Sequence, residues 1–149
     1  MFQRFQNKKV LLGVCGGIAA YKACDLTREL YRQGAEKVQI VITESAKQFI
    51  SPLTLESLSR HPVLETNLSN NTEGTPLHIA LAQEFDAFLI LPATANTMAK
   101  LACGIADDLL TTTALTFTGK PVLIAPAMNT RMWENPLLED NLYRLEAMD

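Results

Sequence analysis

The chain has 149 residues, about the length of one domain, which is long enough to bury a core without disulfide bonds. Hydrophobic residues make up 48% and charged residues 19%, a composition that excludes a disordered chain. The net charge of −3 argues against a nucleic-acid-binding protein, which usually carries a basic surplus. No apolar run approaches the roughly 20 residues of a membrane span, and the polar start does not resemble a signal peptide.

Cysteine usage points to the compartment. Cys15, Cys24 and Cys103 cannot all pair within the chain, and they form no C-x-x-C motif. This pattern is typical of a reduced, cytoplasmic protein and excludes a zinc ribbon or a redox dithiol. We therefore expect a cytoplasmic protein with no bound metal.

Apolar runs typical of buried strands alternate with helical patterns in the first half of the chain. In chain order, the sequence predicts a strand at 9–14, a helix over 19–33, a strand at 37–42, and short helices over 43–49 and 52–59. The pattern then breaks at residues 60–76, which are rich in turn-forming residues and are predicted to form a mobile loop.

The alternation resumes near His78. The second half predicts a strand at 87–91, a helix over 97–103, a helix that begins at 107–108, a strand at 121–125, and helices over 130–133 and 137–146. Strands separated by such helices form right-handed βαβ units. The predicted fold is therefore a three-layer α/β domain, Rossmann-like or flavodoxin-like, with a parallel sheet and helices on both faces. We expect residues 1–149 to form this single domain.

Parallel sheets bind ligands beyond the carboxyl ends of their strands. The segments that follow the predicted strands are all small or polar: 15–19, 43–46, 92–97 and 126–129. In the first of them, Gly16 and Gly17 allow the backbone to approach a ligand, and the next helix offers N–H groups to an anion. The segment is neither G-x-G-x-x-G nor a P-loop, so a phosphate site and a simple tight turn are equally open.

The other segments offer polar groups whose role the pattern alone leaves open. Thr94, Asn96 and Thr97 suit a polyhydroxyl chain or a phosphate, but they also suit a helix cap. Glu44, near the end of the second strand, keeps a dinucleotide ribose contact open. Asn129 is suited to gripping a carboxylate or an amide, with Met132 one turn on as a possible shield from water.

The chain contains two histidines. His78 precedes an apolar stretch and follows the predicted loop, so it is a candidate for the rim of a site, although a lone histidine is more often structural. His61 lies in an expected exposed turn, and we assign it no role.

Five stretches together resemble the flavin-containing cysteine decarboxylases, and among these the phosphopantothenoylcysteine decarboxylases of coenzyme A biosynthesis. They are CGGIAAYK, TESAKQF, PLHIALA, LPATANTMAKLACGIADDLL and APAMNTRMWENP. The resemblance covers nearly the whole chain, and the PAMNxxMW motif argues against the related flavin prenyltransferases. It implies FMN-dependent decarboxylation of 4′-phosphopantothenoylcysteine to 4′-phosphopantetheine.

The same resemblance implies the roles of individual residues. His78 is implied as the catalytic base, and Asn129, with Met132 beside it, as the binder of the substrate carboxylate. The residues implied to bind FMN are Gly16, Gly17, Ile18, Thr43, Phe49, Thr94, Ala95, Asn96, Thr97 and Ala127. The family also implies a homotrimer, or a dodecamer of four trimers, in which the neighbouring subunit supplies the histidine.

The end of the sequence departs from the family pattern. The decarboxylases continue into a substrate clamp and a cysteine that donates the last proton, whereas this sequence ends at Asp149. We therefore expect a truncated domain or a shortened relative without that clamp. Three alternatives stay open: an FMN-binding module without full turnover, a decarboxylase of another cysteine-containing substrate, and an NAD-type oxidoreductase.

Overall fold

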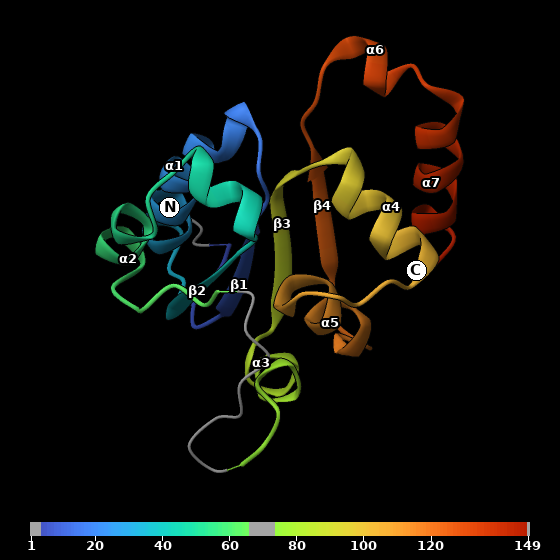
Figure 1. Cartoon of the computed structure of the whole chain (residues 1–149). Helices are drawn as coiled ribbons and strands as arrows, with labels where there is room; N and C mark the ends of the chain where they lie inside the picture. The colour runs from blue at the N-terminus through green and yellow to red at the C-terminus, as the bar shows by residue number, and fades with distance from the viewer. Residues whose placement is uncertain (1–3, 66–73, 149) are drawn as a thin grey trace.

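The computed structural model describes residues 4–65 and 74–148. Within these ranges, four strands form one parallel sheet in the order β2-β1-β3-β4. The strands are β1 (Lys9–Val14), β2 (Lys37–Ile42), β3 (Ala87–Ala93) and β4 (Val122–Pro126). Because helices cover both faces of this sheet, the predicted three-layer α/β fold is confirmed (Figure 1).

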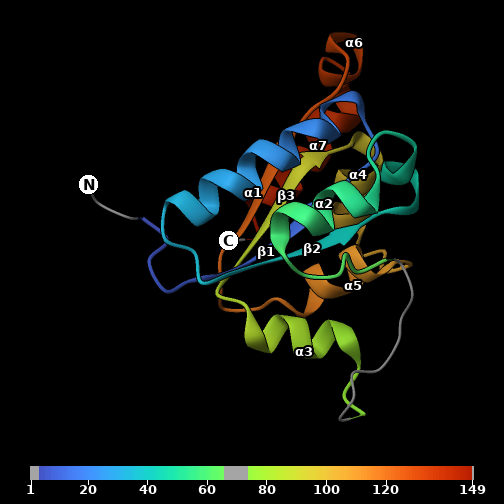
Figure 2. The same cartoon turned by 90° about the vertical axis from the view of Figure 1, so that its left-hand side faces the viewer.

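Two separate cores hold the helices on the sheet. One face carries α1 (Lys22–Arg32) and α2 (Pro52–Ser59), each preceded by a 3₁₀ turn, η1 (Ile18–Tyr21) or η2 (Glu44–Gln48). The other face carries α3 (Leu77–Glu84), α4 (Ala95–Cys103), α5 (Leu109–Thr116) and α7 (Pro136–Glu146) (Figure 2). The short helix α6 (Thr130–Trp133) stands beyond the end of β4, and none of its residues is buried.

The central strand β1 explains why its sequence reads as a continuous apolar run. It pairs with β2 on one side and β3 on the other, and its side chains alternate between the two cores. Val10 and Leu12 enter the core beneath α1, while Leu11 enters the opposite core. Gly13 also faces that opposite core, where a Cβ atom would lie 2.9 Å from Leu110 Cδ1, so α5 packs close against the strand.

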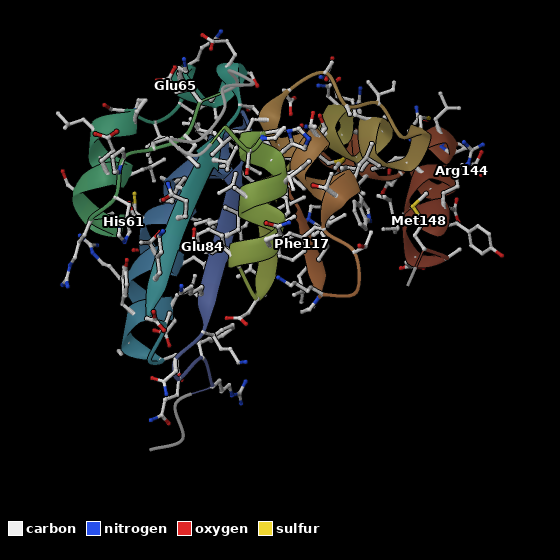
Figure 3. All side chains as sticks on the ribbon, turned by 90° about the horizontal axis from the view of Figure 1, so that it is seen from below. His61, Glu65, Glu84, Phe117, Arg144 and Met148 are labelled. Atoms are coloured by element: carbon white, nitrogen blue, oxygen red, sulfur yellow. The ribbon has the colours of Figure 1, made fainter. Side chains whose placement is uncertain are left out.

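Helix α3, which carries His78, is fixed to the sheet by its far end. Lys120 Nζ donates to three backbone carbonyl oxygens there, those of Ala82, Gln83 and Phe85, at 2.8, 3.0 and 2.7 Å. A cation at these carbonyls also complements the negative end of the helix dipole. Glu84, labelled in Figure 3, accepts from Lys37 Nζ at 2.9 Å and so ties α3 to β2.

The predicted helices agree with the structure most closely where the sequence carries a strong start signal. The ranges predicted for α2 and α6 are those observed, and Asp108 begins α5 with a capping box shared with Thr111. The predicted helix at 19–33 differs, because its first turn is the 3₁₀ turn η1. No helix of the described residues is long and apolar enough to cross a membrane.

Two further predictions need correction. The short helix predicted over 43–49 is the 3₁₀ turn η2, and the side chain of Thr43, which precedes it, makes no capping hydrogen bond; the Thr43 hydroxyl turns instead toward Val14 O, at 3.5 Å. The predicted loop at 60–76 begins with an ordered segment. In it, Leu64 lies alongside β2 and forms a parallel bridge with Val41 of that strand. Residues 66–73 of that loop lie outside the described residues.

Gly16 and Gly17 are adjacent but have different steric surroundings, and neither has a positive φ. A Cβ on Gly16 would lie 2.5 Å from Ser45 Oγ and 2.7 Å from the Ser45 backbone carbon. A Cβ on Gly17 would meet only Thr94 Cγ2, at an ordinary 3.9 Å. Gly16 is therefore required for packing, whereas Gly17 faces open space.

We expect Gly16→Ala to lower the free energy of unfolding by about 1–3 kcal/mol, because the Ser45 backbone must move to admit the methyl group. Gly17→Ala, the matched control, should change it by less than about 1 kcal/mol. Urea unfolding of the ligand-free proteins measures both. Equal losses in the two variants would contradict this steric difference.

Candidate functional site

The turns after β1, β2 and β3 meet at the carboxyl edge of the sheet. We call residues 15–18 the glycine turn and residues 94–97 the threonine turn. The Cys15 N–H donates to Pro92 O at 3.2 Å, and the Thr43 N–H donates to Val14 O at 3.0 Å. The start of η2 then packs on Gly16 through Ser45. Parallel pairing thus collects segments from three separate βαβ units at one place.

The glycine turn offers unused donors. In the described part of the chain, the backbone N–H groups of Gly16 and Gly17 donate no hydrogen bond to another backbone group. The space in front of Gly17 is open, and the neighbouring Ile18 side chain is 84% exposed. Unpaired N–H groups beside open space form a suitable cradle for an anion such as a phosphate.

The threonine turn lies directly beside the glycine turn. Thr94 caps α4 by accepting the Thr97 N–H at 3.3 Å, which confirms the helix-cap interpretation of this segment. The two hydroxyl oxygens lie 3.2 Å apart, and the Thr97 hydroxyl donates to Cys15 Sγ at 3.3 Å. Thr97 is buried and Asn96 is exposed, so different side chains of one turn face the interior and the solvent. Thr94 can cap the helix and also bind a ligand, because its hydroxyl oxygen has two lone pairs and also carries a hydrogen.

The end of β4 brings a fourth segment to the same edge. The Ala127 N–H donates to Ala93 O at 3.0 Å, which places Ala127 next to the end of β3. Asn129 then caps α6, with its Oδ1 accepting the Arg131 N–H at 2.9 Å. That bond occupies the amide oxygen and leaves the Nδ2 group as a donor, which suits the recognition of a carboxylate.

Several apolar side chains around this edge are exposed. Phe49, directly after η2, is 49% exposed, and Met132 and Trp133 on α6 are 48% and 46% exposed. Ala95 is half-buried at the start of α4. Met132 and Trp133 are therefore not core residues within the single chain. They are available to cover a ligand or to contact another molecule.

His78 does not lie with the other predicted residues in the single chain. It belongs to the first turn of α3, where its backbone carbonyl accepts from Thr116 Oγ1 at 3.3 Å. Figures 1 and 2 both place α3 at the bottom of the molecule and α6 at the top. His61, labelled in Figure 3, lies beside α2.

Two residues of this edge were not singled out from the sequence as site residues. Ser45 Oγ lies 3.2 Å from Thr43 Oγ1 and against Gly16, so its hydroxyl belongs to the same cluster. The spacing T-x-S after a buried strand was the available signal. Cys15 is 1% exposed and links the glycine turn to Thr97, a contact between residues 82 positions apart that no local pattern reveals.

The carboxyl edge of the sheet combines a neutral buried thiol with paired charges on the surface. Burial raises the pKa of the Cys15 thiol, and the hydrogen bond from Thr97 only partly opposes this effect, so the thiol stays neutral at pH 7. The charged groups beside the edge lie on the surface and are paired: Lys47 pairs with Glu44 at 2.8 Å within η2, and Lys100 pairs with Asp107 at 2.7 Å and lowers the pKa of that carboxyl group. Across residues 4–65 and 74–148, no three His, Cys, Asp or Glu side chains are grouped as metal ligands.

Two curated relatives of this chain carry names that refer to coenzyme A biosynthesis or to phosphopantothenoylcysteine decarboxylation. The chain is 47% identical over 143 residues to the coenzyme A biosynthesis bifunctional protein CoaBC of Vibrio vulnificus (strain YJ016), aligning 96% of this chain and 35% of that protein. It is also 47% identical over 141 residues to a probable phosphopantothenoylcysteine decarboxylase of Streptococcus mutans, aligning 94% of this chain and 78% of that protein. The chain thus spans about a third of the length of the bifunctional relative.

Solved structures share the fold. The FMN-dependent cysteine decarboxylase SpaF superposes with a TM-score of 0.90 at 35% identity, over 96% of this chain and 81% of that one. A phosphopantothenoylcysteine decarboxylase variant complexed with pantothenoylaminoethenethiol superposes with a TM-score of 0.76 at 32% identity, over 95% and 79%. The family model described as Flavoprotein matches residues 3–149. By this match over almost its whole length, the chain belongs to the Flavoprotein family.

Proposed function

We propose that this chain is the FMN-binding domain of a phosphopantothenoylcysteine decarboxylase. The observation that carries the proposal is the juxtaposition at the carboxyl edge of the sheet: an open anion cradle at Gly17 beside the hydroxyl-rich threonine turn, with the Asn129 amide on the adjoining segment. The identity to the S. mutans relative supports the choice of substrate. A cytoplasmic location fits the three free cysteines.

The residues of the edge fit FMN. The N–H groups of Gly16, Gly17 and Ile18 would receive the phosphate, since a Cβ on Gly17 would meet only Thr94 Cγ2, at 3.9 Å, so the backbone there is accessible to a ligand. The side chains and backbone proposed to hold the ribityl chain or line the ring are those of Thr43, Phe49, Thr94, Ala95, Asn96, Thr97 and Ala127. When bound, FMN would supply a reversible two-electron oxidation of the substrate thiol, which creates the electron sink that loss of CO₂ requires.

Asn129 would orient the carboxylate that is lost. Its Oδ1 is already engaged with the Arg131 N–H, so the side chain cannot rotate freely and its Nδ2 donor has a defined direction. Met132 lies on the same short helix and would shield the carboxylate from water. An amide donor positions the carboxylate without adding a positive charge that would oppose its loss as neutral CO₂.

His78 would act as the base that takes a proton during oxidation of the thiol. Within one chain, α3 and α6 lie at opposite ends of the molecule, so His78 would reach Asn129 only from a second subunit (Figure 1). We therefore propose a homo-oligomer, a trimer or a dodecamer of trimers, with each site completed by its neighbour. The exposed Ile18, Tyr21 and Leu53, at 84%, 56% and 69%, provide apolar surface for such contacts.

The FMN assignment is tested by absorbance. The purified chain should be yellow and should release FMN on denaturation. Gly17→Val should lower flavin occupancy by at least tenfold, because its side chain would fill the space in front of the cradle, while changing the ligand-free melting temperature little. The control is Gly17→Ala, which should retain more flavin than the valine variant. Occupancy unchanged by valine would contradict the phosphate assignment.

The assignments of His78 and Asn129 are tested by anaerobic reduction of the bound flavin with 4′-phosphopantothenoylcysteine. His78→Asn should keep FMN but slow the substrate-dependent loss of visible flavin absorbance by about 10²–10⁴-fold, the typical contribution of a general base. His61→Asn is the matched control and should behave like the parent. A peptide ending in cysteine, used as the second substrate, distinguishes the related peptidyl-cysteine decarboxylases.

Asn129→Asp should also keep FMN. The aspartate can still accept the Arg131 N–H, so α6 keeps its cap, but it loses the amide donor and repels the substrate carboxylate. Flavin reduction at low substrate concentration should fall by at least tenfold and recover in part at lower pH, where one carboxyl group takes up a proton. If both the His78 and Asn129 variants reduce flavin at the parent rate, the proposed site is wrong.

The oligomer is tested by light scattering. Leu53→Glu places a charge on a side chain that is 69% exposed on the surface of α2, so it should leave the monomer folded and lower the assembled mass. Thr118→Glu, at an exposed position outside α2, is the control for added charge. A parent chain that is a stable monomer and still retains FMN tightly would contradict the proposed assembly.

A further inference from the structure

The glycine turn and the threonine turn belong to different βαβ units, yet an anion cradled between them requires a fixed distance between the two. Two contacts of Cys15 join them directly. Its backbone N–H donates to Pro92 O at 3.2 Å, and its sulfur accepts from the Thr97 hydroxyl at 3.3 Å. Cys15 and Thr97 are only 1% and 4% exposed, so neither contact competes with solvent.

The sulfur contact determines the direction of the hydrogen bonds in the threonine turn. A threonine hydroxyl has a single hydrogen, and Thr97 gives it to Cys15 Sγ. The Thr97 oxygen is then the acceptor in its 3.2 Å contact with Thr94 Oγ1, so the Thr94 hydroxyl is the donor. Thr94, whose Cγ2 is the one atom that a Cβ on Gly17 would meet, can redirect this hydrogen to a ligand while Thr97 stays fixed.

We propose that Cys15 is a positioning residue for FMN, whose sulfur anchors Thr97 and so holds the threonine turn against the glycine turn. This inference rests on the proposed function. It assigns to the thiol a role as a neutral hydrogen-bond acceptor that does not touch the cofactor. Neutrality matters beside a phosphate, and burial, which raises the pKa of the thiol, ensures it at pH 7.

The alternative is that Cys15 only fills space in the core. Serine and valine separate the two roles, because serine keeps an acceptor atom but is more polar, whereas valine is apolar and of similar size but accepts no hydrogen bond. A packing role predicts that valine is tolerated and serine is harmful. A positioning role predicts the opposite order for FMN affinity.

The experiment is a titration of each flavin-free protein with FMN, followed by the change in FMN fluorescence, with the melting temperature of the ligand-free protein as a second readout. Cys15→Val should raise the Kd for FMN by about two- to tenfold, the effect expected from one hydrogen bond. Cys15→Ser should stay within about twofold of the parent. Cys24→Val, on α1 and away from both turns, is the matched control and should leave the Kd unchanged.

A double variant tests whether Cys15 affects FMN binding through its hydrogen bond with Thr97. Thr97→Val removes the donor, so adding Cys15→Val to it should raise the Kd no further, whereas independent effects would multiply. If the parent binds FMN and the valine variant binds it equally well, the positioning role is overturned and the proposed function stands. If the parent binds no FMN, the proposed function fails and this inference fails with it.

Discussion

Parallel hydrogen bonding of β1 to a neighbour on each side is the constraint on which the rest of the structure depends. Because β2 and β3 both run parallel to β1, their carboxyl ends, and that of β4 beyond them, lie at one edge of the sheet. Each strand must then be followed by a segment that turns away toward a helix. Those segments meet whether or not a ligand is present, and their small residues are what allows them to meet closely.

This constraint explains which features of the fold and of the candidate site can be predicted from the sequence. Strands buried on both faces give long apolar runs, and residues such as Pro52 and Asp108 begin helices by local chemistry, so the elements follow from neighbouring residues. The right-handed connection of βαβ units then limits which face of the sheet each connecting helix covers. The edge that gathers the site was therefore predictable before any side-chain contact was known.

What the sequence does not predict are contacts between residues far apart along the chain. The two glycines of the turn look equivalent in the sequence. In the structure, Ser45 from the next βαβ unit fills the space beside Gly16 but does not reach the space beside Gly17. The position of His78 is a second case. It depends on how α3 docks. Lys120, which is 35 to 38 positions away along the chain, contributes to that docking by donating to carbonyl oxygens at the far end of the helix.

The separation of His78 from Asn129 also bears on why so much apolar surface is exposed near the proposed site. A domain with two well-filled cores has no need to leave Ile18, Phe49 and Trp133 accessible at the same edge. Exposed aromatic and aliphatic side chains gathered in one region are typical of surfaces that bind other molecules. The proposed active site shared between subunits would account for both observations at once, because the same contact would cover the apolar surface and deliver the histidine. It would also make flavin binding and assembly mutually dependent, since each would stabilise the other by mass action.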